Sequence, residues 1–376
     1  MLFKKDIRLM IKDSRINKTK GFTRTPNLAS QELPAVRSTM PNLVSGFTLA
    51  ELVVGVAVFT VISISVYSSY VSIFNVVKTS QAKIDAISLI NEQLEIVRNL
   101  PYSDVGEVSG IPKGKLLHTQ TLIKDGYQYA VTITVRNIDD PFDGTLGGTP
   151  NDLSPADFKV VEVDVDCSQC KNFKTTSVTT RVAPKNLETA STNGALFVRV
   201  FDANGNPVQD ANVHIVNNQV SPAIIIDDVT NVSGMLQVVD APPGVNAYEV
   251  TVTKSGYSTD KTYTPTAPNP NPSKPNATVL LQQVTQLSFI IDKLSTLDVT
   301  SVTNNCVPVP GMDFNLTGAK LIGSPNVLKY SQNQVTNGSG ILLLNNIEWD
   351  TYTITAIDGT YDLIGINPIS PVAVSP

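Results

Sequence analysis

The sequence of 376 residues predicts an α+β chain, in which one long N-terminal helix precedes a small β-sheet head and two all-β sandwich domains. Residues 52–77 form an uncharged, mainly apolar run, and residues 47–100 contain no proline. Helical patterns stop after Leu100 and are replaced by the alternating runs typical of strands. From about residue 192 the chain repeats itself, with matching positions 101 to 106 residues apart. These three observations predict the order of the elements.

The N-terminal part has the charge and length of a membrane anchor. Residues 1–46 contain nine Lys and Arg against three Asp and Glu, a net charge of +6. This excess keeps them cytoplasmic and directs the C-terminus outward. The apolar run is long enough to cross a hydrocarbon core of roughly 30 Å at about 1.5 Å per residue. We therefore expect a single-pass protein of the cytoplasmic membrane, in contact with lipid.

Glu51 interrupts the apolar segment. A carboxylate there costs on the order of 3 kcal/mol in lipid, so it requires a partner or an interfacial position. The surrounding string, Gly46-Phe47-Thr48-Leu49-Ala50-Glu51-Leu52, resembles the cleavage and methylation signal of type IV prepilins and pseudopilins. The alternative is an ordinary single-pass anchor with a chance Glu near its edge.

The resemblance implies a processing site and an assembly residue. A prepilin peptidase would cut after Gly46, which leaves Phe47 as the new, N-methylated first residue. Glu51 would pair with the free amino group of a neighbouring subunit, and the apolar helices would bundle in a fibre core. The leader is long for this family, so translation from Met10 or Met40 is also open.

The resemblance and the patterns together predict five segments. They are a cytoplasmic prepilin leader (1–46), a transmembrane and stalk helix (47–100), a pilin-like β head (101–187), a first β-sandwich (192–283), and a second, incomplete β-sandwich repeat (284–376). In the stalk, Ile84, Ile87, Ile90, Leu94 and Val97 form one apolar stripe, which we expect to pack on the head. Pro101 ends the helix.

Two features of the head are candidate sites. Cys167 and Cys170 form a Cys-x-x-Cys motif between two predicted strands, which is compatible with redox chemistry, half a zinc site, free thiols or a turn-closing disulfide. Outside the cell we favour the disulfide. Asp139, Asp140 and Asp143 flank a glycine-rich loop, and their oxygens suit calcium, the one cofactor we consider. Their spacing does not match an EF-hand, and Asp and Gly are also ordinary loop residues.

The repeated part is composed of strands and turns. Thr230-Asn231-Val232-Ser233-Gly234 matches Thr336-Asn337-Gly338-Ser339-Gly340, and Tyr248-Glu249-Val250-Thr251-Val252 matches Tyr352-Thr353-Ile354-Thr355-Ala356. Short strands at such intervals predict a sandwich. The order of phrases in the first copy resembles carboxypeptidase regulatory-like domains, which implies a transthyretin-like or Ig-like fold and no peptidase activity.

The second copy differs from the first at its end. The strand at residues 278–282 is expected to close the first sandwich, whereas the second copy stops one strand short. Either the sequence is truncated, or the last sheet has an open edge that another chain fills.

The composition excludes several functions. Two His and three Cys give no nucleophilic triad and no confident metal site, so we expect no enzyme. Without residues 1–46 the net charge is −11, which disfavours nucleic acid as a partner. The sequence predicts a type IV pilus or pseudopilus subunit that displays its sandwiches to a surface ligand. The alternatives are a minor or tip pseudopilin of a type II secretion or DNA-uptake system, and a membrane-tethered adhesin or carbohydrate-binding protein that does not polymerise.

Overall fold

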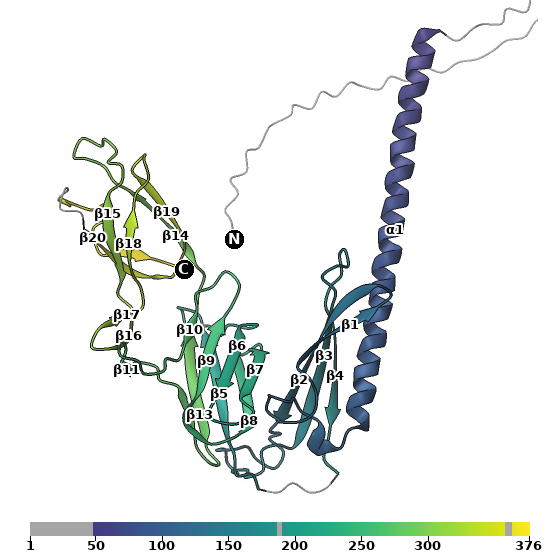
Figure 1. Ribbon diagram of the computed structural model, residues 1–376, viewed down its shortest axis with the longest axis vertical. Coiled ribbons are helices and arrows are strands. Elements are labelled where there is room, and N and C mark those ends of the chain that lie inside the picture. The colour runs from purple at the N-terminus through teal and green to yellow at the C-terminus, as the bar shows by residue number, and fades with distance from the viewer. Residues whose placement is uncertain (1–47, 186–189, 358–362) are drawn as a thin grey trace, which may run out of the picture. The chain divides into compact units, whose positions relative to one another are not determined.

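The computed structural model describes residues 48–185, 190–357 and 363–376. It is an α+β chain with one long helix followed by β-sheets (Figure 1), as the sequence predicts. The chain divides into two units, residues 1–66 and 67–376, and each is described by itself. Helix α1 (Leu49–Asn99) begins in the first unit and continues into the second. A single 3-10 turn, η1 (Tyr102–Asp104), follows Pro101, whose missing N–H and fixed φ stop the helix.

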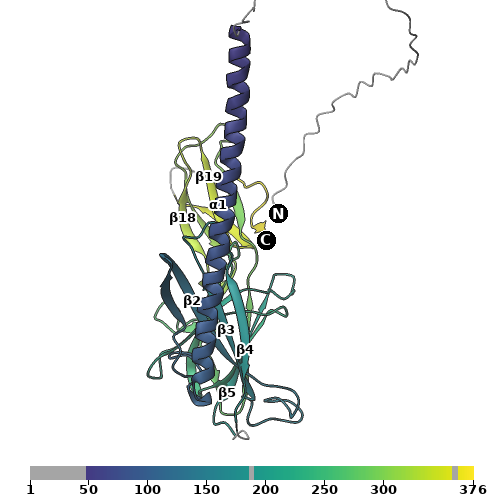
Figure 2. The same ribbon diagram turned by 90° about the vertical axis from the view of Figure 1, so that its right-hand side faces the viewer.

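The head is an antiparallel meander in which each strand pairs with the next. Its sheet has the order β1-β2-β3-β4. The strands are β1 (Thr119–Lys124), β2 (Tyr127–Ile138), β3 (Phe158–Asp166) and β4 (Thr176–Val182). Figure 2 shows the lower part of α1 lying across β2, β3 and β4. Alternation along β2 and β3 directs one face of the sheet toward the helix, where it forms an apolar core with α1.

The helix residues that enter this core differ from the predicted stripe. Ile90, Leu94 and Val97 are buried, as expected. Ile84 and Ile87 are 61% and 51% exposed, so the prediction was wrong for these two of the five residues. The other buried residues of α1 are Ala82, Asp85, Ala86, Leu89 and Gln93, most of which are smaller than isoleucine or polar.

Hydrogen-bonded polar pairs explain why the face of α1 with Asp85 and Gln93 packs on the sheet of the head. The Tyr129 hydroxyl donates to Asp85 Oδ2 at 3.3 Å, and Gln120 Nε2 donates to Gln93 Oε1 at 2.9 Å. Asp85, which also accepts from Gln81 Nε2 at 3.3 Å, is 3% exposed and Tyr129 is fully buried, so each gains a hydrogen-bond partner inside the core. The two alanines let the sheet approach the helix closely.

The first sandwich consists of two facing sheets. One has the order β13-β5-β8, and the other has the order β10-β9-β6-β7 with β12 pairing with β9. The strands are β5 (Gly194–Phe201), β6 (Asn212–Asn217), β7 (Ile224–Val229), β8 (Met235–Ala241), β9 (Gly244–Thr253), β10 (Asp260–Lys261), β12 (Ala277–Val279) and β13 (Val284–Ile290). Strand β13 runs parallel to β5, from the pair Val284 and Ala195 to the pair Ile290 and Phe201.

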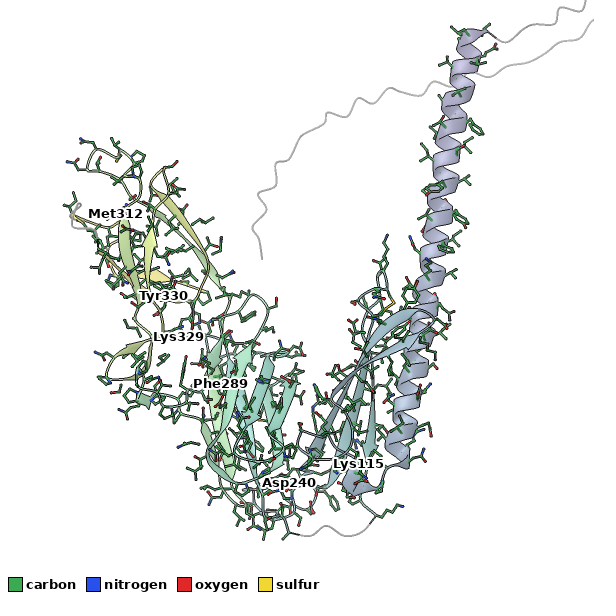
Figure 3. All side chains as sticks on the ribbon, in the orientation of Figure 1. Lys115, Asp240, Phe289, Met312, Lys329 and Tyr330 are labelled. Carbon is green, nitrogen blue, oxygen red and sulfur yellow. A yellow bond between two sulfur atoms is a disulfide. The ribbon has the colours of Figure 1, made fainter. Side chains whose placement is uncertain are left out.

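Strand β13 changes the predicted end of the first sandwich. The sequence analysis placed residues 284–376 in the second repeat and let residues 278–282 close the first. In the structure Val284–Ile290 completes the first sandwich, and Phe289 is fully buried in its core (Figure 3). Pairing between the first and last strands of a domain is non-local, so adjacency in sequence does not indicate it.

The second sandwich pairs β14 with β19 in one sheet, and the other has the order β18-β15-β20-β21. The strands are β14 (Ser295–Thr300), β15 (Asp313–Gly318), β18 (Ser331–Val335), β19 (Ile341–Ile347), β20 (Asp350–Ala356) and β21 (Val372–Val374). A separate small sheet contains β11 (Asn271–Pro272), β16 (Leu321–Ser324) and β17 (Val327–Leu328).

The same turn occurs in both sandwiches, formed by the matched Thr-Asn-x-Ser-Gly phrases, with its Thr and Gly buried and the three residues between them exposed. The Thr230 hydroxyl accepts from Ala211 N at 3.0 Å and donates to the Val208 carbonyl at 2.7 Å. Thr336 accepts from Met312 N at 3.0 Å in the same way. Gly234 and Gly340 end the turn at φ of +68° and +72°, and a Cβ on Gly234 would lie 2.5 Å from the Val200 carbonyl oxygen. The repeat seen in the sequence therefore preserves a turn that only these residue types build.

The contact between α1 and the head generates a prediction. Tyr129→Phe removes the hydroxyl that donates to buried Asp85, so we expect it to lower the free energy of unfolding by about 1–3 kcal/mol. Denaturant titration of the detergent-solubilised chain measures this. Tyr127→Phe is the control, since Tyr127 lies on the same strand and is only half-buried. Equal losses in both variants would contradict a specific role for the Tyr129 bond.

Candidate functional site: the start of the helix and its exposed face

Helix α1 begins with a capping box made by Thr48 and Glu51. The Thr48 backbone N–H and hydroxyl both donate to Glu51 Oε2 at 2.9 Å, and Glu51 N donates to Thr48 Oγ1 at 3.3 Å. These bonds satisfy N–H groups that the first turn of a helix otherwise leaves unpaired. Gly46 and Phe47, the predicted processing site, lie outside the described residues.

The capping box gives Glu51 a partner that the sequence analysis missed. The Thr-x-x-Glu spacing before an apolar run is the signal that could have revealed it. Both bonds described for this carboxylate use Oε2, so Oε1 can accept from a further donor. Within a single chain, Glu51 therefore stabilises the start of the helix, and its carboxylate stays available to a neighbour.

The first half of α1 is an uncovered apolar surface. Among the described residues, α1 is the one helix that is long and apolar enough to cross a membrane. The most apolar 18-residue stretch of this helix contains no buried residue. Hydroxyl groups in this segment bond to the helix itself. Thr60 Oγ1 donates to the Val56 carbonyl at 2.7 Å, and Ser65 Oγ donates to the Val61 carbonyl at 2.8 Å. Such bonds let hydroxyls remain in an apolar environment without outside partners.

The uncovered surface continues into the stalk along one face. At alternating spacings of three and four residues, which place side chains on one helix face, lie Tyr70, Ile73, Val77, Ser80, Ile84 and Ile87. All six are exposed. Ile84 and Ile87 extend the apolar face to the level of the head, whose core takes the residues around Ala86 instead. We call these six residues the seam face. It has the pattern of a surface that packs against other helices.

The predicted calcium ligands lie in one loop, where they bind backbone N–H groups. Leu146 N donates to Asp139 Oδ2 at 2.9 Å, and Phe142 N donates to Asp140 Oδ1 at 3.1 Å. The negative charge of Asp143 raises the pKa of Asp139. The described residues contain no group of three or more His, Cys, Asp or Glu arranged to hold a metal ion. Calcium binding thus stays a prediction.

Asp139 has an unusual proton affinity within this loop. Burial raises its pKa to about 6, against the bond from Leu146, and the charges of Asp157, Asp152 and Asp143 raise it further. The second carboxylate oxygen of Asp139 is buried without a hydrogen-bond partner in the described structure. The Asp139 carboxyl group therefore ionises at a higher pH than a free Asp.

Cys167 and Cys170 form a disulfide just after β3. Cys170 N donates to the Cys167 carbonyl at 3.2 Å, so the bond closes a tight turn, and Cys167 is 3% exposed within the core of the head. Paired in this way, neither sulfur is a thiolate able to bind zinc.

Comparisons with known proteins assign no family. No protein-family model and no curated protein matches the chain. Solved structures give weak similarities, among them the Bacillus anthracis TIE protein (13% identity, 68% of this chain and 52% of that one, TM-score 0.22). A streptococcal ancillary pilin (11%, 57% and 70%, 0.22) and the shaft pilin SpaA of Lactobacillus rhamnosus GG (13%, 46% and 90%, 0.18) are others. The chain spans about half the length of the TIE protein. At these TM-scores the matches support no argument about fold or function.

Asp139 generates a prediction about pH. The folded state holds this proton to about pH 6, whereas the unfolded chain releases it near pH 4, so ionisation opposes folding increasingly as pH rises between these values. Asp139→Asn keeps an acceptor for Leu146 N and removes the charge. We expect the variant to be more stable above pH 6 by on the order of 1 kcal/mol, after discounting for solvent screening, and equal to wild type below pH 4.

Thermal unfolding across this pH range measures the difference. Repeating the thermal unfolding with added calcium distinguishes a metal-binding loop from a loop that binds no metal. If the loop binds calcium, the ion should stabilise the wild type more than Asp139→Asn at pH 7. A pH-independent difference between the two proteins would contradict the raised pKa.

Proposed function

We propose that the chain is a structural subunit of a type IV pilus-like surface fibre. In this proposal a prepilin peptidase cuts after Gly46, the protein is held in the cytoplasmic membrane with its C-terminus outside, and α1 assembles with the helices of other subunits. The sandwiches act as spacers or adhesive surfaces toward an extracellular ligand. The function is mechanical and involves no catalysis.

One observation supports the proposal above the others. The Gly-Phe-Thr-Leu-Ala-Glu-Leu string stands at the start of a helix whose first half is apolar and uncovered and whose second half is covered by a β-sheet. An ordinary anchor needs an apolar segment but no continuous helix into its head. A subunit that packs in a bundle uses such a helix both as its membrane segment and as its contact surface.

The seam face adds a second argument. Ile84 and Ile87 lie beyond the apolar run, so the lipid that covers that run does not cover them. Their exposure to water is unfavourable. Neighbouring helices would cover them in a fibre. We therefore propose that subunits meet along the seam face as well as within the membrane-spanning part.

A minor or tip subunit is the second candidate. Two sandwiches follow the head, and their bulk would crowd a fibre in which every subunit displayed them. A membrane-tethered adhesin that never polymerises is the alternative of another class. Abundance in sheared surface fibres distinguishes the three, since a major subunit dominates them, a tip subunit is rare and a tethered protein is absent.

The capping box allows a sharp test of Glu51. Gln also completes a capping box, so Glu51→Gln should keep the helix start and remove only the charge. Thr48→Ala removes the cap and keeps the charge. We expect both variants to be processed to N-methylated Phe47, as mass spectrometry of the recovered protein would show. We expect Glu51→Gln alone to reduce fibre yield by more than about tenfold, because an ion pair in a low-dielectric core is lost.

Two outcomes of this experiment would contradict the proposal. An intact leader on the recovered protein would leave a tethered surface protein as the better account. Wild-type fibre yield from Glu51→Gln, together with a loss in Thr48→Ala, would indicate that Glu51 acts only by capping the helix.

The seam face generates a separate prediction. Ile84→Ser combined with Ile87→Ser should leave the isolated protein within about 0.5 kcal/mol of wild type, since both side chains are exposed. Fibre yield should fall, because burial of such side chains on assembly contributes about 1 kcal/mol or more each. Ile123→Ser, at an exposed position of β1, is the matched control. Sheared fibres quantified by immunoblot give the readout, and equal yields from both proteins would exclude the seam face as a contact.

A further inference from the structure

The sheet β13-β5-β8 of the first sandwich has one face that its core does not use. Leu196, Val198 and Val200 of β5 point into the core and are fully buried. By the period of two along a strand, Phe197 and Arg199 point to the opposite face. Phe197 is half-buried there, and Arg199 is exposed. Both line a shallow groove of about 720 Å³ that lies over this face.

The strand register arranges the side chains of the groove in rows. In one row Phe197 lies between Gln286 of β13 and Gln237 of β8. In the next row Arg199 lies beside Met235 of β8. Both glutamines are exposed, and neither side-chain amide has a hydrogen-bond partner among the described residues. The groove therefore offers an aromatic ring with an unpaired amide on either side.

A loop of the head forms one wall of the groove. Gly147 N donates to Asn151 Oδ1 at 2.6 Å, and both residues line the groove. A Cβ on Gly147 would lie 3.4 Å from Val284 Cγ2, so the loop comes close to the start of β13. The five aspartates of residues 139–157 belong to the same part of the head, but none of them lines the groove.

The charge of the groove is positive in an acidic protein. Among the described residues that line it, Arg199 is the one with a charge. Its guanidinium has no ion pair within residues 48–185, 190–357 and 363–376, whereas Arg136 pairs with two carboxylates. Without residues 1–46 the net charge of the chain is −11. A ligand that completes the groove should therefore carry a negative charge.

The second sandwich indicates that the fold does not require these residues. Strand β14 pairs with β19 as β5 pairs with β8. The counterparts of Phe197 and Arg199 on β14 are Asp298 and Thr300, and the residue before each of them points into its own core. Both counterparts are exposed. Since a related sheet forms with these side chains, the aromatic ring and the arginine of the first sandwich are not needed for folding.

We propose that the groove over β13-β5-β8 binds an acidic saccharide, a chain of sugar rings that carry carboxylates. The apolar C–H face of one ring packs on Phe197, and its hydroxyls bond to Gln237 and Gln286. Sugar hydroxyls and side-chain amides both donate and accept, so the two sets of groups match. A carboxylate pairs with the planar fork of Arg199. This inference rests on the proposed function, in which the sandwiches contact an extracellular ligand, and it names the class of that ligand.

An acidic peptide fits the groove less well. Extended peptides bind to sheets at an edge, where they pair with free backbone N–H and carbonyl groups. The groove lies over a face, and the backbone of β5 beneath it is paired on both sides, with β13 and with β8. Only side chains are thus available to a ligand, which favours a molecule with many hydroxyl groups.

Fluorescence polarisation of labelled tetrasaccharides with the detergent-solubilised full chain measures the binding. The probes are tetramers of galacturonate, of mannuronate, and of alternating glucuronate and N-acetylglucosamine. Each has a control in which the carboxylates are reduced to alcohols. We expect an acidic probe to bind with a Kd below about 1 mM and its reduced form to bind about tenfold more weakly. Binding should weaken as salt is raised, because the pair with exposed Arg199 is screened.

Two arginines supply the matched variants. Arg199→Gln removes the charge of the groove, and Arg181→Gln makes the same change at an exposed position of β4. We expect Arg199→Gln to weaken binding of the acidic probe about tenfold, Arg199→Lys to have an intermediate effect, and Arg181→Gln to have none. Phe197→Leu should also weaken binding, since it removes the ring beneath the sugar. Thermal unfolding verifies that each variant is folded.

Four results would overturn the proposal. They are no binding of any acidic probe up to about 5 mM, equal binding of the acidic and reduced probes, equal affinity of Arg199→Gln and wild type, or tighter binding of tetraglutamate than of every saccharide. The last result would assign the groove to an acidic peptide. Fibre yield is a separate measurement, so the saccharide site can fail while the fibre subunit stands, and the reverse.

Discussion

The apolar surface of helix α1 is the constraint on which the rest of this molecule depends. A helix of 51 residues exposes apolar side chains along its whole length, and each fully buried one contributes about 1.5–3 kcal/mol. The head covers only one face of its second half, through Ala86, Leu89 and Ile90. The remaining surface must be covered by lipid or by other chains. One helix therefore carries both a face that folding buries and a face that folding leaves uncovered.

The polar residues at the contact between α1 and the head determine which face of the helix packs on the sheet and which face points outward. Asp85 and Gln93 would be destabilising if they were buried without partners, yet Asp85 has a partner on β2 and Gln93 has one on β1. Their pairing fixes the rotation of the helix against the sheet. As a consequence Ile84 and Ile87 point outward, although they are more apolar than Asp85 and Gln93, which are buried. Specificity of orientation thus outweighs maximal apolar burial at this contact.

Much of the architecture was accessible from sequence because local patterns determine it. Pro101 marks the end of the helix, alternation marks the strands of the head, and the recurring turn phrases mark two related sandwiches. The rotation of α1 was not accessible, since two apolar faces compete and distant Tyr129 decides between them. The parallel pairing of β13 with β5 was hidden for a similar reason, because its partners are almost ninety residues apart. Thr48 was missed although its spacing to Glu51 is a readable signal.

The parallel pairing in the first sandwich also has a mechanical consequence. The chain enters that domain at the start of β5 and leaves it at the end of β13, and these points lie at opposite ends of two hydrogen-bonded neighbours. Tension along the chain therefore pulls the two strands past each other in shear, so the load is shared by the whole ladder of backbone bonds at once. In the second sandwich the edge of β14 has no such ladder among the described residues. Among the described residues the two related domains therefore differ in the one pairing that is loaded in shear.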